Sequence, residues 1–302
     1  MISRRHVHGY GQGLATIELE DLPELAVDRA GLAAMFLASF DAPEYQPPLL
    51  PSTALELLQV ARRPDVTFPA VAALIQREPL IASQVLRLAQ SPVYRRAEPI
   101  RSLDQAARTI GLRGLADLFL QASLTARVFR APAYEGPMTR LRDHSIATAI
   151  VARLVCRATS LADDYAFLCG LLHDVGTAAC LIVLADRFGG GPGKGPSAPV
   201  RTFWPVISEL HEATAMKLAE MWQLPADVRL VIGHHHRLTV GGMVHPLAAV
   251  VCVADSIATE LGAGFETEVD RRQVELATAA LRLTPAQVQS VVREATPLLK
   301  TG

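Results

Sequence analysis

The second half of the chain carries histidines and aspartates with the chemistry of metal ligands. They are His144, the adjacent pair His173 and Asp174, His211, one histidine of the run 234–236, and Asp255. Imidazole nitrogens and carboxylate oxygens together suit Zn, Mn, Fe, Co or Ni. Two such ions about 3.5–4 Å apart can clamp a phosphate group and activate a water molecule. These residue types therefore indicate a centre for one or two divalent transition-metal ions.

Helical phase predicts that each of these side chains faces the protein interior. His144 is in phase with Val151, and within the histidine run His235 is in phase with Val228 and Ile232. Buried polar groups are costly unless they are hydrogen-bonded, paired or bound to a metal. A single buried histidine is more often a hydrogen-bonded core residue than a ligand. Six candidates on five predicted helices instead indicate one polar site inside a core.

The elements that position these residues are predicted to be helices. Half of the residues are hydrophobic, and only 5% are aromatic. The apolar residues are mostly Ala, Leu and Val, which favour helices over strands. We find no convincing strand and expect an all-α, multi-helix bundle. Around the candidate ligands, helices are expected at about 139–159, 163–187, 205–223, 225–236 and 246–261, with two more in the tail.

Capping patterns and prolines predict further helices in the first half of the chain. A short helix is expected at 28–40, before a proline-rich connector. Later helix starts are predicted at a capping box of Thr53 and Glu56, at Thr67 with Pro69, at Pro79, and at a capping box of Ser102 and Gln105. Gly111 is expected to end the helix that Ser102 begins.

The charge composition limits the classes of partner, and the cysteines indicate the compartment. The 29 basic and 30 acidic residues give a net charge of −1 without blocks of like charge, so no nucleic-acid footprint is expected. The four cysteines form no CxxC pair, which favours buried thiols in a reducing compartment. No signal peptide and no apolar run of about 18 residues is recognised, so we expect a cytoplasmic protein without a membrane contact.

Several sequence motifs resemble one family. In the first half these are LLPSTALELL, LIQREPLIASQVLRLAQSPVY and IRSLDQAARTIGLRGLADL. In the second half they are LCGLLHDVGTA, ELHEATAMKLAEMWQLP, VIGHHHR and VVCVADSIA. Over about residues 47–262 the chain resembles the HDOD family, bacterial signalling domains related to HD-type metal-dependent phosphohydrolases. Two departures are conservative, because Glu78 stands where Asp is usual and Gln90 where Asn is usual.

The resemblance implies a domain organisation. Residues 1–46 would be an N-terminal extension with a short helix, 47–262 the HDOD domain, and 263–302 a C-terminal helical tail. Within the domain, 47–130 would form an N-terminal helical half and 138–262 an HD-like half. The segment 188–199 is predicted to be a flexible, solvated insertion, with a lid over the site as the alternative.

The resemblance also implies a ligand set. By similarity to the cyclic-dinucleotide phosphodiesterase branch of HD proteins, seven residues fall on metal-ligand positions: His144, His173, Asp174, His211, His235, His236 and Asp255. Asp174 is the catalytic candidate if the protein is an enzyme. That branch has a lysine where Thr177 stands and an acidic residue where Arg237 stands. Thr177 and Arg237 are nevertheless the candidates for contact with a substrate phosphate.

These departures leave three functions open. Loss of the lysine weakens phosphate binding, since a hydroxyl carries no charge. We therefore favour a regulatory module that acts through a signalling protein partner and keeps a metal site. The alternative is a metal-dependent phosphohydrolase or phosphodiesterase acting on a nucleotide or cyclic dinucleotide. A third hypothesis, nucleotide binding without cleavage, is weakened by the same missing lysine.

Overall fold

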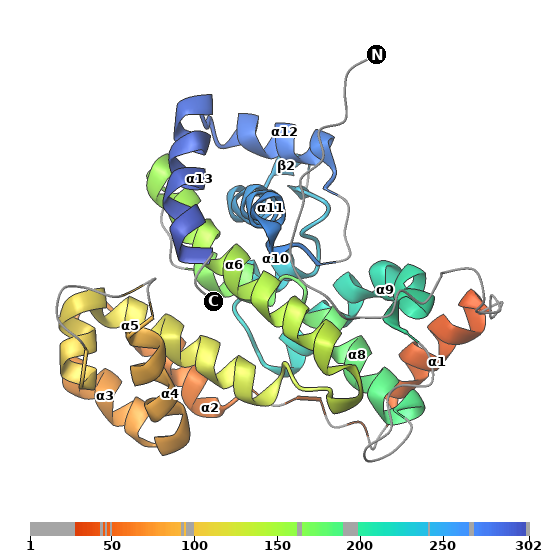
Figure 1. Cartoon of the computed structure of the whole chain (residues 1–302), viewed down its shortest axis with the longest axis horizontal. Helices are drawn as coiled ribbons and strands as arrows, with labels where there is room; N and C mark the ends of the chain where they lie inside the picture. The colour runs from red at the N-terminus through yellow and green to blue at the C-terminus, as the bar shows by residue number, and fades with distance from the viewer. Residues whose placement is uncertain are drawn as a thin grey trace, which may run out of the picture.

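The structure, a computed structural model, describes residues 28–42, 45, 47–48, 50–91, 94, 100–161, 165–189, 199–240, 242–265 and 269–299. Most of these residues are helical, which confirms the predicted all-α class (Figure 1). Residues 1–27 and most of the segment 188–199 lie outside the described residues. The predicted division of the chain at 46/47 and 262/263 stays a prediction.

The first half of the chain forms a group of helices at one end of the molecule. It contains α2 (Ser52–Val60), α3 (Phe68–Gln76), α4 (Pro79–Ala89) and α5 (Leu103–Arg127), which pack on one another. The preceding helix α1 (Arg29–Asp41) lies away from this group and packs on α8 and α9 of the second half (Figure 1).

The predicted helix starts in this half are largely confirmed. Thr67 and Glu78 precede α3 and α4, and each helix has a proline in its first turn. Ser102 caps α5 by accepting a hydrogen bond from the backbone N–H of Gln105. Gly111, with a φ of +78° and a ψ of 165°, ends the first helical stretch of α5 as predicted, and a second helical stretch follows at once.

The capping box of Thr53 and Glu56 is wrong. Helix α2 begins two residues earlier than predicted, at Ser52, and Pro51 stands at its N-cap. Thr53 is buried inside the first turn, and Glu56 accepts a hydrogen bond at 2.6 Å from Arg77, the C-cap residue of α3. Proline has no side-chain acceptor to cap the helix, and its carbonyl oxygen accepts the backbone N–H of Ala54 at 2.8 Å.

The second half of the chain surrounds the long helix α6 (Glu135–Thr159), which follows the short 3₁₀ helix η1 (Pro132–Tyr134). Its other helices are α7 (Ala166–Leu172), α8 (Val175–Phe188), α9 (Val200–Met221), α10 (Ala226–Ile232) and α11 (Pro246–Ala258). Helix α6 packs on α7 and α11, and α8 packs on α9. The tail comprises a π-helical turn η2 (Thr259–Ala263), α12 (Arg271–Ala280) and α13 (Pro285–Leu299), and it covers α11 and α6 (Figure 1).

Two helices predicted as continuous are interrupted. The stretch 163–187 divides into α7 and α8, with His173 and Asp174 in the turn between them. The stretch 225–236 is helical only to Ile232, so His234, His235 and His236 lie in the turn that follows. Adjacent residues of a continuous helix point about 100° apart, whereas these turns let adjacent side chains face one site.

The expectation of no strand is wrong for one short stretch. Strands β1 (Thr239–Val240) and β2 (Met243–Val244) form an antiparallel hairpin directly after the histidine turn. Gly242 supplies the positive φ of +81° in its tight turn.

Glycines allow the helices around the site to approach closely. A Cβ on Gly170 would lie 2.7 Å from the Cα of Ala149, so α7 lies directly against the backbone of α6. A Cβ on Gly176 would collide with the carbonyl oxygen of His211, so α8 crosses α9 backbone to backbone. The close crossings bring the start of α8 and the middle of α9 together.

Two helical runs among the described residues are long and apolar enough to cross a membrane by composition alone. They are Ala166–Phe188 and Pro246–Ala263. The first run is 94% buried within the fold and is interrupted by the turn at His173 and Asp174. Its apolar composition is accounted for by its place in the core.

Candidate metal centre

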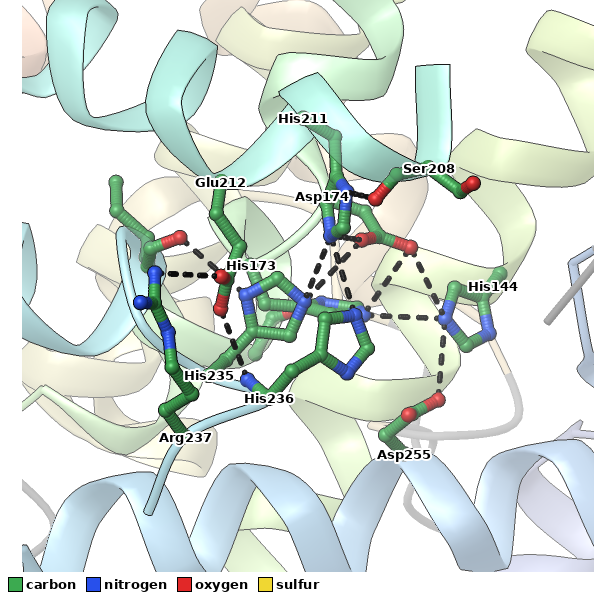
Figure 2. A network of polar contacts seen from close by, with 12 residues as sticks. His144, His173, Asp174, Ser208, His211, Glu212, His235, His236, Arg237 and Asp255 are labelled. Atoms are coloured by element: carbon green, nitrogen blue, oxygen red, sulfur yellow. Dashed lines mark hydrogen bonds and ion pairs between the residues drawn. The ribbon is translucent and has the colours of Figure 1, made fainter. Parts of the chain in front are cut away.

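The structure brings all seven predicted ligand residues to one place (Figure 2). Helix α6 contributes His144, the turn before α8 contributes His173 and Asp174, and α9 contributes His211. The turn after α10 contributes His235 and His236, and α11 contributes Asp255. Their possible ligand atoms form three overlapping groups, and within each group all atoms lie within 4.8 Å of one another.

Asp174 lies between two sets of imidazoles. Its Oδ2 atom is 3.5 Å from Nε2 of His173 and 3.7 Å from Nε2 of His144. Its Oδ1 atom is 3.4 Å from Nε2 of His235 and 3.7 Å from Nε2 of His211. Each carboxylate oxygen therefore faces a different set of imidazoles. A carboxylate that bridges two positive charges has the same arrangement.

Each set is completed by one further residue. Asp255 places its Oδ1 atom 3.3 Å from Nε2 of His144, which in turn is 3.1 Å from Nε2 of His173. On the other side, Nε2 of His211 is 3.1 Å from Nε2 of His236 and 3.4 Å from Nε2 of His235. The candidate ligands are thus two imidazoles and a carboxylate on one side, and three imidazoles on the other, with Asp174 common to both.

The backbone fixes the tautomer of four of these rings. Their Nδ1 atoms lie at hydrogen-bond distance from carbonyl oxygens, for His144 from Ala263 (2.9 Å), His173 from Gly170 (2.8 Å), His211 from Ser208 (2.8 Å) and His235 from Ile232 (3.3 Å). A neutral ring that donates through Nδ1 has a lone pair on Nε2.

Lone pairs therefore converge inside the cluster. The Nε2 atoms of His144 and His173 are 3.1 Å apart, and two lone pairs at this distance repel unless a cation lies beside them. Histidines that bind metals usually donate their other ring N–H to a carbonyl or carboxylate in this way. The donor set fits a divalent metal ion on geometric grounds.

Burial and the neighbouring charges shift the pKa of Asp174 in opposite directions. Burial alone would raise the pKa of this carboxyl, but the neighbouring His173, His211 and His235 hold its pKa well below the usual range. Burial also lowers the pKa of His235 to about 4. Both residues are therefore in the deprotonated form that metal binding requires.

The predicted interior positions are confirmed for most of the cluster. His144, His173, Asp174, His211 and His235 are buried. Asp255 is instead 23% exposed at its side chain and His236 is exposed. These two residues form the edge of the cluster, because α11 and the histidine turn border the surface there.

The two predicted substrate contacts differ in their surroundings. Thr177 is buried in α8, and its hydroxyl has no hydrogen-bond partner among the described residues. Arg237 is 66% exposed and donates a hydrogen bond to Oε2 of Glu212 at 3.1 Å. Their role in phosphate binding stays a prediction.

Glu212 is a site residue that the sequence reasoning missed. Its Oε1 atom accepts the backbone N–H of His236 at 3.1 Å, while its Oε2 atom accepts from Arg237. Burial would raise the pKa of Glu212, but the His236 N–H and the nearby histidines lower it, so the carboxylate is ionised. Glu212 thus ties the histidine turn to α9. The available signal was its position beside His211, with a complementary arginine after the histidine run.

Comparison with known proteins identifies the class to which this fold and cluster belong. The profile of the HDOD domain matches residues 48–238, which is more than half of the chain. The chain therefore belongs to the HDOD domain family. An uncharacterized protein of Treponema pallidum (strain Nichols) is 28% identical over 207 residues, which cover 63% of this chain. The matched part spans only 38% of that relative's length.

Solved structures share the fold. An HDOD domain protein of unknown function from Geobacter sulfurreducens has a TM-score of 0.63 at 24% identity, and 89% of each chain is covered. A protein named as a candidate metal-dependent phosphohydrolase, from Shewanella amazonensis SB2B, has a TM-score of 0.66 at 17% identity, with 90% of this chain and 99% of that chain covered. A candidate signal transduction protein from Marinobacter aquaeolei VT8 has a TM-score of 0.60 at 19% identity, with 90% and 64% covered.

Proposed function

We propose that this HDOD protein is a cytoplasmic signal-transduction module that binds two divalent metal ions in the histidine–aspartate cluster. The observation that carries this proposal is the position of Asp174, whose two oxygens face two separate sets of imidazole Nε2 atoms. A neutral core histidine has one donor and one acceptor nitrogen. These rings donate through Nδ1 to backbone carbonyls, so their Nε2 lone pairs face one another and a cation would satisfy them.

The ligand assignment follows from the distances. His144, His173 and Asp255 would hold one ion, and His211, His235 and His236 would hold the other, with Asp174 shared between them. Nitrogen and oxygen donors of this kind suit Mn, Fe, Co, Ni or Zn. When bound, such ions would polarise phosphoryl oxygens and lower the pKa of a water molecule.

A regulatory role is supported by how the centre is connected. Its ligands come from helices or turns throughout the second half, and the backbone carbonyl of Ala263 in the tail supports His144. Occupation of the centre would therefore fix the positions of α6, α9, α11 and the tail relative to one another. The output of such a module would be contact with a signalling protein partner, which is favoured in only one state of the centre.

Hydrolysis of a phosphate ester is the second candidate function. It is favoured by one observation, namely that Asp255 and His236 reach the surface, so a substrate could approach the ions from that side. Asp174 would then orient both ions, and the half-buried Glu212 would hold His236 in place. Turnover of a nucleotide panel by metal-loaded protein tests this candidate, and absence of turnover by fully loaded protein would reject it.

Elemental analysis of protein purified without a nickel column tests the primary proposal. Wild-type protein reconstituted with Mn²⁺ or Fe²⁺ is expected to retain two ions per chain after gel filtration. His235→Ala should lose at least one ion, whereas the matched control His234→Ala, in the same turn but outside the three ligand groups, should keep both. Equal metal content in the two variants would contradict the assignment.

A further inference from the structure

A small pocket opens beside the exposed edge of the cluster. Its volume is about 90 Å³. The walls include His236 and Asp255 of the cluster, Cys252 of α11, and Asp270, Gln273 and Val274 at the start of α12. The tail, which lies outside the segment matched by the HDOD profile, therefore supplies one side of this pocket.

The tail side of the pocket carries an unused polar group. Asp270 caps α12 by accepting the backbone N–H groups of Arg272 at 2.9 Å and Gln273 at 3.4 Å, which fixes the first turn of this helix. The side-chain oxygen of Gln273 is buried without a hydrogen-bond partner among the described residues. A buried amide oxygen without a partner is costly. The amide can turn by 180° and offer either a donor or an acceptor, so it is suited to a polar ligand in the pocket.

The size of the pocket limits what this ligand can be. Pockets for drug-sized molecules measure about 300–1,000 Å³, several times more than the volume found here. At about 90 Å³ the pocket has room for a few water molecules or one tetrahedral oxyanion. A terminal phosphate can enter such a pocket end-on, with the rest of the molecule outside. A bridging phosphodiester would need room for a nucleoside on both sides.

We infer that Gln273 is a ligand-contacting residue of the metal centre and that the tail restricts the centre to terminal phosphate groups over bridging phosphodiesters. This inference rests on the proposed function, because the bound cations supply the positive charge that an oxyanion needs. Gln273 donates its side-chain N–H to a phosphate oxygen, and His236 and Asp255 border the opposite wall. The same pocket serves a module that senses a terminal phosphate and an enzyme that removes one.

Isothermal titration of full-length, metal-loaded protein tests this inference with three probes: inorganic phosphate, AMP and cyclic di-GMP. Phosphate and AMP are expected to bind, and cyclic di-GMP is not. Gln273→Ala should weaken phosphate binding about three- to tenfold, as expected for one lost hydrogen bond. Gln273→Glu should weaken it at least as much, because a like charge then faces the oxyanion. Glu275→Ala, at an exposed position of the same helix, is the matched control and should bind phosphate like the wild type.

Metal content, measured on each sample, distinguishes a failure of the proposed function from a failure of the pocket assignment. A wild-type protein that retains no metal refutes the proposed function. A wild-type protein that retains metal but binds neither phosphate nor AMP refutes the pocket assignment alone. Unchanged phosphate affinity in both Gln273 variants at full metal content, or binding of cyclic di-GMP as tight as that of phosphate, would also overturn the inference.

Discussion

The substitution Asp174→Asn separates metal binding from folding. Asp174 is buried, and its oxygens lie 3.4–3.7 Å from four imidazole nitrogens. Asparagine keeps the shape but removes the charge and one of the two oxygens that face the proposed ions. Its amide N–H₂ can donate to an Nε2 lone pair, so the metal-free variant should stay folded, within about 1 kcal/mol of the metal-free wild type.

The expected change in Tm follows from the free energy by which bound ions stabilise the folded state. An ion present at 100 times its dissociation constant stabilises the folded state by about 2.7 kcal/mol, so two independent ions contribute about 5 kcal/mol. For a chain of this size, 1 kcal/mol corresponds to roughly 2 °C in Tm. Removal of metal should therefore lower the Tm of the wild type by roughly 10 °C and leave the Tm of Asp174→Asn nearly unchanged.

Thermal unfolding with and without a chelator, on both proteins after metal loading, measures this difference directly. The wild type should show the shift and regain it when Mn²⁺ or Fe²⁺ is restored. A variant that shows the same chelator-dependent shift as the wild type would refute the role of Asp174 as the shared ligand. A wild type without any shift would refute the metal centre.

Three further predictions concern the supporting structure. Glu212→Ala should lower the affinity for the more weakly held ion about 10- to 100-fold in a competition titration, because the histidine turn loses its link to α9. Glu209→Ala, at an exposed position of the same helix, should leave this affinity unchanged. In the metal-free protein, burial lowers the pKa of His235 from 6.5 to about 4, so the unfolded chain binds a proton that the folded chain resists. The free energy of unfolding should therefore keep its full value above pH 6.5 and fall by roughly 3 kcal/mol as pH decreases towards 4. Urea unfolding across that pH range measures this change. A free energy of unfolding that does not change with pH would contradict the burial of a neutral ring. Gly176→Ala should destabilise the protein by about 1–3 kcal/mol or more, because its Cβ collides with the backbone of α9. Gly114→Ala, where a Cβ meets only ordinary contacts at 3.4 Å or more, should be neutral or slightly stabilising in the same unfolding assay, because alanine favours the helix.

The positions of the candidate ligands could be predicted from the sequence because helical phase and residue type carried the same information. His144 and His211 lie inside long helices, so their apolar neighbours at helical spacing indicated the buried face. The prolines in the first turns of α3 and α4 likewise marked helix starts, since a proline in the first turn loses no hydrogen bond.

The breaks in the helices could not be predicted from periodicity. The residues around His173 and Asp174 are apolar on all sides of the helix, so the pattern of apolar residues does not change where α7 ends and α8 begins. His235 was expected to face the core as part of a helix, and it does so from a turn. In both places two adjacent ligands face one site, which a continuous helix would not allow.

Contacts made by backbone atoms were equally hidden. The carbonyl oxygens that orient His144 and His211 belong to Ala263 and Ser208, and a carbonyl carries no signature in the sequence. Glu212 was missed for a related reason, since one of its partners is the backbone N–H of His236. The orientation of the ligands therefore depends on tertiary structure, although their identities do not.

Anomalous scattering from crystals of Mn²⁺-loaded protein would locate the ions in the cluster. Two peaks are expected, about 3.5–4 Å apart, one on the side of His144, His173 and Asp255 and one on the side of His211, His235 and His236, with Asp174 between them. Loaded crystals with no peak in the cluster, or with manganese bound only elsewhere on the chain, would contradict the proposed metal centre.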